Sequence, residues 1–219
     1  MKTYNNKCCI CSQIHGEQEN DLISKLLNET QYTRRIILEN ESFVVIPSLG
    51  AITPGHSIIC PKKHIKSIAQ LDEKLEEDYY KIKEKISRLL RKTYKSDIHY
   101  FEHGTARNSS KILCTVDHAH MHIIPCNVSI ELLLFKDLLW VEANNTISDL
   151  RDVVGSNEYI YYESPEEKIF VAKNICEEFE SQYMRKVFKL ALNQNSDWNW
   201  RETPKAEEAN EVYKLLTQI

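Results

Sequence analysis

Three histidines at alternate positions, His118, His120 and His122, are the residues of this sequence best suited to chemistry. Side chains of a β-strand alternate between its two faces, so a strand over residues 118–125 would place the three imidazoles on one face. A row of imidazoles packs poorly in a core, but it can bind metal, transfer protons or attack an electrophile. The intervening apolar residues would face the opposite way: Ala119, Met121 and Ile123.

A metal site made by the three histidines alone is the main alternative, because zinc hydrolases use three-histidine sites. His118 and His122 would lie roughly 13 Å apart along an extended strand. At most two of these histidines can therefore share one ion.

Cys8 and Cys11 form a C-x-x-C pair near the start of the sequence. Such a pair serves zinc sites and redox sites alike. No thioredoxin-like βαβ pattern follows it, so the pair favours a metal site.

The composition places few limits on function. The 219 residues allow one large domain, or a medium domain with an extension, and the formal net charge of −4 does not favour nucleic acid globally. No apolar run has the length of a membrane span, and the first residues lack the apolar core of a signal peptide. Seven cysteines, an odd number, fit free thiols in a reducing cytoplasm.

Ahead of the histidines, the hydrophobic pattern predicts an α+β domain with a mainly antiparallel sheet of about five strands. A long helix precedes the fourth strand, since apolar residues from Leu71 to Leu89 recur at steps of three and four. The expected strands cover residues 36–38, 43–46, 56–60, 98–102 and 118–125.

The second half has a different character and predicts a mixed α/β extension over residues 128–219, packed on a first domain of residues 1–127. An apolar run covers 130–141, and a short helix is expected over 146–153. A hairpin is expected over 159–162 and 169–172, and helices over 177–192 and 206–216.

The tail of the sequence carries polar and aromatic residues that suit nucleotides. Arginine recognises phosphate and tryptophan stacks on bases. A helix packing on the first domain, with its tryptophans as core, explains the same residues, and we favour this packing interpretation. The residues concerned are Gln182, Arg185, Trp198, Trp200 and Arg201.

Residues 7–126 resemble the histidine triad (HIT) superfamily. The resemblance rests on the run from His118 to Ile124, on PGHSIICPKKH at 54–64, and on the N-terminal C-x-x-C that matches zinc-containing branches. It implies a HIT-like fold and a nucleotide or nucleotide conjugate as substrate. Many relatives are homodimers, so it also implies a homodimer.

The resemblance implies covalent catalysis by His120, which would attack the α-phosphorus of a nucleotide conjugate and form a nucleotidyl-histidine. Water or another acceptor would then release the nucleotide. His122 would contact the phosphate or the bridging oxygen, and Thr115 falls where relatives place a phosphate-contacting hydroxyl. Histidine at 122, where transferase relatives commonly have glutamine, favours hydrolysis.

The same resemblance implies a structural zinc ion. Its ligands would be Cys8, Cys11, His64 and His118, as in galactose-1-phosphate uridylyltransferase-like members. Two thiolates and two imidazoles make a closed tetrahedral site with no open position. Such a site would tie the N-terminus to the histidine strand. No organic cofactor is expected.

Two positions depart from the pattern of nucleoside-binding relatives. Ser48 stands where an acidic residue holds the ribose hydroxyls, and Glu102 stands where an asparagine is expected. Glu102 orients a group or a water in one interpretation and is a surface carboxylate in the other. We keep Ser48 and Glu102 as candidate substrate-binding residues beside Thr115.

These features predict a hydrolase of nucleoside phosphoramidates, dinucleoside polyphosphates or similar conjugates. A nucleotidyl- or adenylyltransferase with the same His120 intermediate is the first alternative. A nucleotide-binding module with little turnover is the second. Action on nucleotide-capped nucleic acid ends has no support from an extended basic surface.

Overall fold

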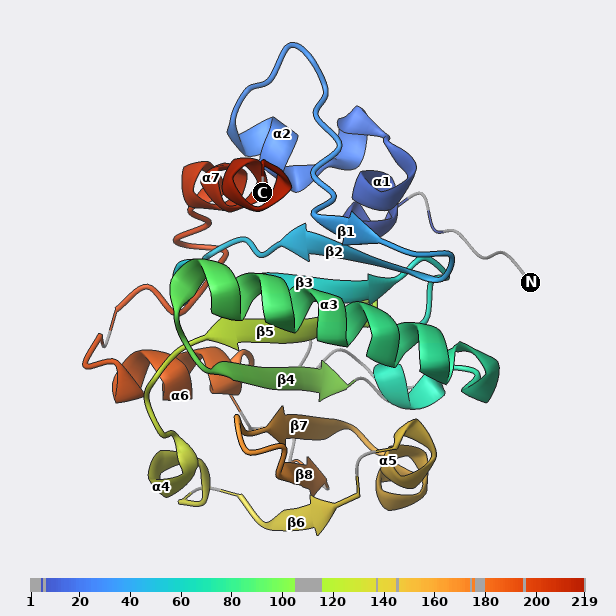
Figure 1. Cartoon of the computed structure of the whole chain (residues 1–219), viewed down its shortest axis with the longest axis vertical. Helices are drawn as coiled ribbons and strands as arrows, with labels where there is room; N and C mark the ends of the chain where they lie inside the picture. Colours follow the sequence, from blue (N-terminus) through green and yellow to red (C-terminus); the bar gives the residue numbers. More distant parts are fainter. Residues whose placement is uncertain are drawn as a thin grey trace.

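The computed structural model describes residues 5, 7–104, 116–136, 138–144, 146–173, 175, 180–194 and 196–218. Within them, eight strands form one sheet in the order β1-β2-β3-β5-β4-β7-β8-β6 (Figure 1). Every neighbouring pair is antiparallel. The α+β class and the mainly antiparallel sheet are therefore confirmed, while eight strands exceed the expected five because the second half adds three to the same sheet.

The first half supplies five strands and the long helix. The strands are β1 (Leu38–Glu39), β2 (Phe43–Pro47), β3 (Ser57–Pro61), β4 (Ile98–Gly104) and β5 (Met121–Pro125). Helix α3 (Glu76–Tyr94) begins after a turn in which the Asp72 side chain accepts from Lys74 N, and it ends at Lys95 in the left-handed conformation. Helix α3 crosses one face of the sheet (Figure 1), and its apolar residues Tyr79, Ile82, Ile86 and Leu90 are buried there.

Shorter helices complete the chain. The N-terminal part contains α1 (Cys9–His15) and α2 (Leu22–Leu26), and the second half contains α4 (Glu131–Leu134), α5 (Ile147–Val154), α6 (Tyr183–Ala191) and α7 (Ala206–Thr217). Three 3₁₀ turns cover Gln18–Asn20, Ile68–Gln70 and Glu73–Leu75. Thr146 caps α5 through its side chain, as the expected helix over 146–153 requires.

The histidine strand is shorter than the sequence predicts. β5 starts at Met121, and its ladder to β3 runs from Met121–Ile59 to Ile123–Ser57. Residues 118–120 lie beyond that ladder, and Ala119 N donates instead to the Ile65 carbonyl in the loop after β3. Strand β3 itself continues to Pro61 in its ladder with β2, so the histidine segment leaves the sheet at Met121 although its neighbour goes on.

The second half extends the sheet of the first half. Strand β7 (Tyr159–Glu163) pairs with β4 over five residues, β8 (Ile169–Lys173) pairs with β7, and β6 (Trp140–Ala143) forms the outer edge. The expected hairpin over 159–172 is confirmed. Because β7 occupies the free edge of β4, the sheet runs from one half into the other; the division at residue 127 stays a prediction.

Hydrophobic clusters cover both faces of the sheet. On one face, α3 and α5 pack on a core that contains Met121 and Ile123. On the other face, α4 and α6 pack around Phe101 and Ile124, and α1 packs on Val44, Ile46 and Ile58. This second face, between α1 and α6, holds the pocket described below.

Helices α2 and α7, from opposite halves of the chain, meet at one edge of the molecule. Helix α7 lies beside α2 at the edge formed by β1 and β2 (Figure 1), and Ile23 packs on Ala206 and Ala209. The buried Arg35 joins them, because its Nε donates to Asn210 Oδ1 at 2.9 Å. None of the helices within the described ranges combines the length and hydropathy that crossing a bilayer requires.

Candidate active site and metal cluster

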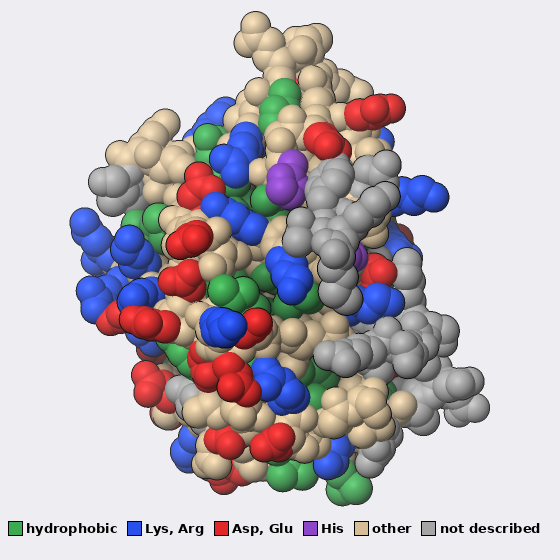
Figure 2. Space-filling view, turned by 90° about the vertical axis from the view of Figure 1, so that its right-hand side faces the viewer, with side chains coloured by type: hydrophobic (Ala, Val, Ile, Leu, Met, Phe, Trp, Pro, Cys, Tyr) green, Lys and Arg blue, Asp and Glu red, His purple; other side chains and the backbone are tan. Residues whose placement is uncertain are grey.

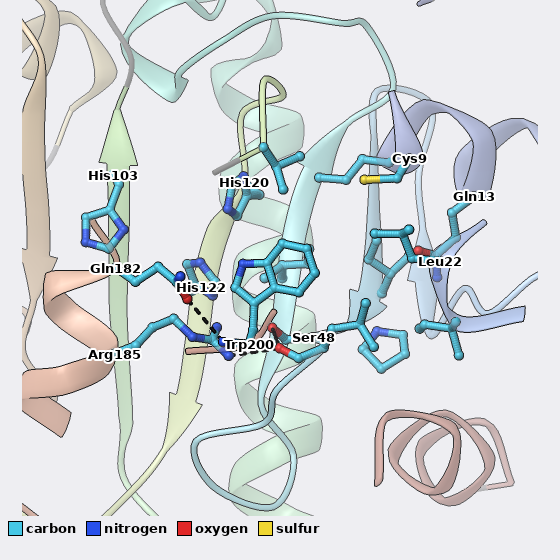
Figure 3. Close-up of a pocket in the computed structure, with 17 residues that line it drawn as sticks. Cys9, Gln13, Leu22, Ser48, His103, His120, His122, Gln182, Arg185 and Trp200 are labelled. Carbon is cyan, nitrogen blue, oxygen red and sulfur yellow. Dashed lines mark hydrogen bonds between the residues drawn. The ribbon is translucent and has the colours of Figure 1, made fainter. Parts of the chain in front are cut away.

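A pocket opens on the sheet face between α1, α2 and α6 (Figure 3). It encloses about 720 Å³, counted out to its open mouth. One part of the lining is apolar and comes from the N-terminal helices and from β2 and β3. The polar lining comes from the histidines and from the second half: Ser48, His103, His120, His122, Gln182, Arg185 and Trp200.

The orientation of His120 is fixed by its own backbone neighbourhood. Its Nδ1 lies 2.6 Å from the carbonyl oxygen of His118. A carbonyl only accepts, so Nδ1 carries the hydrogen and Nε2 keeps its lone pair. The half-buried ring lines the pocket, and burial lowers the pKa of His120 to about 4. His120 thus presents the neutral form that a nucleophile or base needs.

The tautomer of His122 is set by a relay that starts at a backbone amide. Ile52 N donates to Nδ1 of His56, which leaves the hydrogen of His56 on Nε2. That Nε2 lies 2.9 Å from Nδ1 of His122 and donates to it. The remaining hydrogen of a neutral His122 is therefore on Nε2, which makes it a hydrogen-bond donor.

Burial keeps the relay neutral. It lowers the pKa of both His56 and His122 well below the ordinary value, and the positive charge of Arg185 lowers both further. The His122 ring stacks on Phe101 with centroids 4.2 Å apart, and its centroid lies 4.9 Å from that of His120. The two rings are therefore neighbours with different roles in hydrogen bonding. Nε2 of His120 is an acceptor, and Nε2 of His122 is a donor.

Four residues gather in a second, closed cluster. Ligand atoms of Cys8, Cys11, His64 and His118 lie within 4.8 Å of one another, and three of these residues are buried. Nδ1 of His118 is 3.5 Å from both thiol sulfurs, and Nδ1 of His64 is 3.4 Å from Cys11 Sγ. A tetrahedral zinc site predicts about 3.6 Å between sulfur and nitrogen ligands. The cluster therefore fits a metal ion of that size.

The protonation states also suit a metal. Nε2 of His118 donates to the Pro61 carbonyl at 2.8 Å, so Nδ1 offers its lone pair to the cluster. The hydrogen bond between the two thiols lowers the pKa of Cys8 to about 3 and raises the pKa of Cys11 above its ordinary value, so without a metal the pair shares one proton. The side chain of His118 therefore belongs to the cluster, while its backbone carbonyl orients His120.

The other predicted site residues have different positions. Ser48 lines the pocket, and its hydroxyl donates to the Leu49 carbonyl at 3.2 Å. Thr115 lies outside the described residues. The structure does not bring Glu102 to the pocket, because strand alternation turns it to the face that α3 covers, while His103 faces the pocket.

Glu102 is instead a buried structural carboxyl. Its Oε1 accepts from Ile68 N at 2.8 Å, and the Tyr159 hydroxyl donates to Oε2. Burial raises the pKa of Glu102 to about 7, although both hydrogen bonds lower it. Sequence reasoning kept it as a candidate ligand because the face of an isolated strand cannot be assigned without its partners.

This raised pKa predicts a pH-dependent stability. Because the pKa of Glu102 is higher in the folded state than in the unfolded state, its contribution to stability is fully present below pH 4.5. This contribution is lost as the pH rises to about 7. The shift corresponds to about 3 kcal/mol of unfolding free energy. Urea denaturation at pH 5, 7 and 8.5 should show this loss in the wild type and a flatter profile in Glu102→Gln. Parallel profiles would contradict the assignment, and exposed Glu84→Gln is the control.

Gln182 holds in place the part of the pocket wall that the second half of the chain contributes. This residue precedes α6 in the left-handed conformation, with φ of 63°. Its amide nitrogen donates to Asn199 Oδ1 at 3.0 Å, and its oxygen accepts from Trp200 N at 3.2 Å. Gln182 therefore positions Trp200, which is half-buried and lines the pocket rather than a core, unlike the packing that the sequence favours.

Gly50 permits the close approach of Trp200. A Cβ at position 50 would meet Trp200 Cβ at 2.5 Å and Trp200 Cα at 2.7 Å, and Gly50 has φ of +59°. We expect Gly50→Ala to displace residues near Trp200 and to cost roughly 1–3 kcal/mol of stability. Denaturation and tryptophan fluorescence measure both effects. Gly155→Ala is the control, because Gly155 also has positive φ but no atom within 4 Å; unchanged fluorescence in Gly50→Ala would contradict the prediction.

Two residues of the site have little sequence signal. His56 is one histidine at the start of a strand, and only the pairing of β3 with β5 reveals its contact with His122. The sequence favours Arg185 as part of a helix that packs on the first domain. In the structure Arg185 is buried and lines the pocket. Both roles depend on contacts between distant segments.

Comparisons with known proteins agree with this site. Residues 29–127 match the family model of the HIT domain. Among curated proteins, "Protein hit" of Bacillus subtilis is 28% identical over 89 residues, which are 41% of this chain and 59% of that protein. Bis(5'-adenosyl)-triphosphatase of Dictyostelium discoideum is 27% identical over 41% of this chain and 58% of its own length. Galactose-1-phosphate uridylyltransferase of Saccharomyces cerevisiae is 26% identical over 50% of this chain and 31% of its own length.

The histidine pair, the Cys/His cluster and the antiparallel sheet are the features of this chain that accompany the match to the HIT domain. Residues 29–127, a little under half of the chain, match the HIT domain of the histidine triad superfamily. It spans less than two thirds of the length of the relatives described above. Cys8, Cys11 and the wall formed by residues 182–200 lie outside the matched domain.

Proposed function

We propose that this protein hydrolyses nucleotide conjugates at the α-phosphate, with His120 as the nucleophile. The observation that carries the proposal is the pairing of His120 and His122 in one pocket. Nε2 of His120 is the nitrogen left free to attack, and Nε2 of the neighbouring His122 carries a hydrogen. The relationship to a triphosphatase supports the hydrolytic reaction.

The reaction has two displacements. Nε2 of His120 bonds to the α-phosphorus, the bond from phosphorus to the leaving group breaks, and the leaving group takes the electron pair. A water then bonds to phosphorus, the phosphorus–nitrogen bond breaks, and one proton goes to solvent. The nucleoside monophosphate leaves and neutral His120 is restored. Two moderate barriers thereby replace one high barrier.

Fixed groups stabilise the charges in this sequence. The intermediate carries a positive imidazolium, because Nδ1 of His120 keeps its hydrogen while Nε2 holds the phosphorus. The His118 carbonyl, 2.6 Å away, accepts that hydrogen and offsets the charge. The N–H of His122 donates to a phosphate oxygen in the transition state.

We assign zinc to the cluster of Cys8, Cys11, His64 and His118, on the donor set and the spacing of the ligand atoms. Four protein ligands leave no open position, so the ion supplies structural support. Holding the His118 side chain also fixes the backbone carbonyl that orients His120. The cluster thus supports the nucleophile from outside the pocket.

Turnover in H₂¹⁸O tests the proposal directly. The full-length protein would be incubated with diadenosine tetraphosphate, adenosine and guanosine phosphoramidates, and sugar nucleotides. Hydrolysis at the α-phosphorus is expected to place one ¹⁸O in the released nucleoside monophosphate, measured by mass spectrometry. Label only in the leaving group, or no product from any conjugate, would overturn the proposal.

A nucleotidyltransferase is the second candidate, because a uridylyltransferase is among the relatives. It would use the same His120 intermediate with an acceptor other than water. Adding inorganic phosphate or a sugar phosphate to the ¹⁸O experiment separates the two. Unlabelled nucleoside diphosphate or sugar nucleotide would identify a transferase.

The remaining alternatives have less support. A binding module with little turnover rested on Ser48 and Glu102, of which only Ser48 lines the pocket. Action on nucleic acid ends would need an extended basic surface, which the sequence does not predict. Figure 2 shows Lys and Arg side chains interspersed with Asp and Glu on the face it displays. The homodimer and the cytoplasmic location stay predictions; light scattering tests the first, and any pairing through β4 would have to displace β7.

A further inference from the structure

Arg185 is a buried cation inside the candidate active site. It is 2% exposed, it belongs to α6, and it lines the same pocket as His120 and His122. Burying a charge is costly unless the charge is paired. The partners of Arg185 therefore decide what it does.

Arg185 has no acidic partner among the residues that the structure describes. Nε donates to the Trp198 carbonyl at 3.1 Å, and Nη2 donates to the carbonyls of Leu49 and Gly50. These three acceptors are neutral, and the described pocket lining contains neither Asp nor Glu. The positive charge is thus held rigidly but is not neutralised.

The other polar groups of the pocket do not neutralise it either. His103 accepts from Met184 N through Nε2, and burial lowers the pKa of His103 to about 3, so this ring is neutral. The side chain of Gln182 is occupied by Asn199 and Trp200. The pocket therefore has one fixed positive charge, which attracts an anion.

The position of Arg185 indicates which anion. In the view of Figure 3, His122 lies between His120 and the guanidinium of Arg185, which is near Ser48 and Trp200. A phosphate attacked by His120 meets the N–H of His122 first. The guanidinium, which lies on the far side of His122 in this view, is therefore expected to meet a second phosphate.

We propose that Arg185 determines specificity by binding a second phosphate of the substrate, in addition to the phosphate that His120 attacks. This inference rests on the proposed function for the identity of the first phosphate. The second phosphate has two possible sources, the leaving polyphosphate chain or a phosphate on the ribose. In either case the substrate is doubly phosphorylated, and a phosphoramidate of a nucleoside monophosphate is a poor substrate.

Calorimetric binding to full-length protein that carries His120→Ala tests this without turnover. The probes are AMP, ADP and adenosine 3',5'-bisphosphate, with the guanosine series in parallel. ADP or the bisphosphate is expected to bind at least about tenfold more tightly than the monophosphate. Tighter binding of ADP would identify the leaving polyphosphate chain as the source of the second phosphate. Tighter binding of the bisphosphate would identify the phosphate on the ribose.

Variants of Arg185 then test whether this residue causes the preference for a second phosphate. Arg185→Gln should remove it, and Arg185→Lys should retain part of it because the charge remains. Lys186→Gln is the control, since it removes a charge from the exposed side of the same helix and Lys186 does not line the pocket, so it should keep the preference. Thermal unfolding checks that each variant is folded.

Equal affinity for mono- and bisphosphates, or a preference that survives in folded Arg185→Gln, would overturn the inference. If Arg185→Gln fails to fold, a reduced preference in folded Arg185→Lys supports the inference, and an undiminished preference in that variant overturns it. An Arg185-dependent preference without turnover of any conjugate would overturn only the proposed reaction. A nucleotidyl adduct on His120 without a preference would overturn only the role of Arg185.

Discussion

Replacing His120 by alanine is expected to lower kcat/KM for the best conjugate by a factor on the order of 10⁴ or more, because the covalent route is lost. The wild type, quenched during turnover, should carry the mass of one nucleotidyl group, and the His120→Ala variant should not. Intact-protein mass spectrometry and product release measure the two effects. The fold should be unaffected, since the half-buried His120 ring makes its described side-chain hydrogen bond only to a backbone carbonyl.

A matched histidine variant makes this result specific. His15 is exposed at the end of α1, far along the chain from the triad, and His15→Ala should retain full turnover and the adduct. An adduct that persists in His120→Ala would transfer the nucleophilic role to another residue. Loss of turnover with an unchanged affinity for nucleotide would agree with a role in the chemical step.

Loss of the metal cluster is expected to have the largest effect on stability. Structural zinc contributes directly to folding free energy, because the ligands converge only in the folded chain. We expect one zinc per chain in the wild type and almost none in Cys11→Ser. Its Tm should be lower by about 10 °C or more, which corresponds to a few kcal/mol for a chain of this size. Atomic emission and calorimetry measure these quantities.

The adjacent thiol provides the control. Cys9 lies between the two cysteine ligands but outside the cluster, so Cys9→Ser should keep the zinc. A wild type that lacks stoichiometric zinc after expression in zinc-supplemented medium would refute the assignment. Equal zinc contents in Cys9→Ser and Cys11→Ser would also refute the assignment of zinc to this cluster.

Local patterns predicted the features that depend on a single segment. The alternation around the histidines correctly placed Ala119, Met121 and Ile123 on the opposite face, and the structure shows that this face packs in the core with α3. The convergence of the four cluster residues came from the resemblance to the superfamily, and their ligand atoms are indeed close together. Strand alternation and helix periodicity are properties of short windows, so a sequence displays them directly.

Features that depend on two distant segments were not predictable in the same way. The relay from Ile52 through His56 to His122 requires the register of β3 against β5. The position of Glu102 requires knowledge of which face of β4 the long helix covers. Arg185 reaches the pocket only because β7 adds to β4 and carries the second half across the sheet. Pairing of this kind is decided by the whole fold and not by local propensity.

The contact of α7 with the N-terminal part of the chain has a consequence for synthesis of the protein on the ribosome. Residues 1–127 leave the ribosome with the reactive histidine and every cluster ligand, while Arg185 and α7 are still unmade. Arg35 and Asn210 are separated by 175 positions, and contacts at such separation form late in folding. The nascent chain thus contains the proposed nucleophile, His120, before the proposed specificity residue, Arg185, has been synthesised.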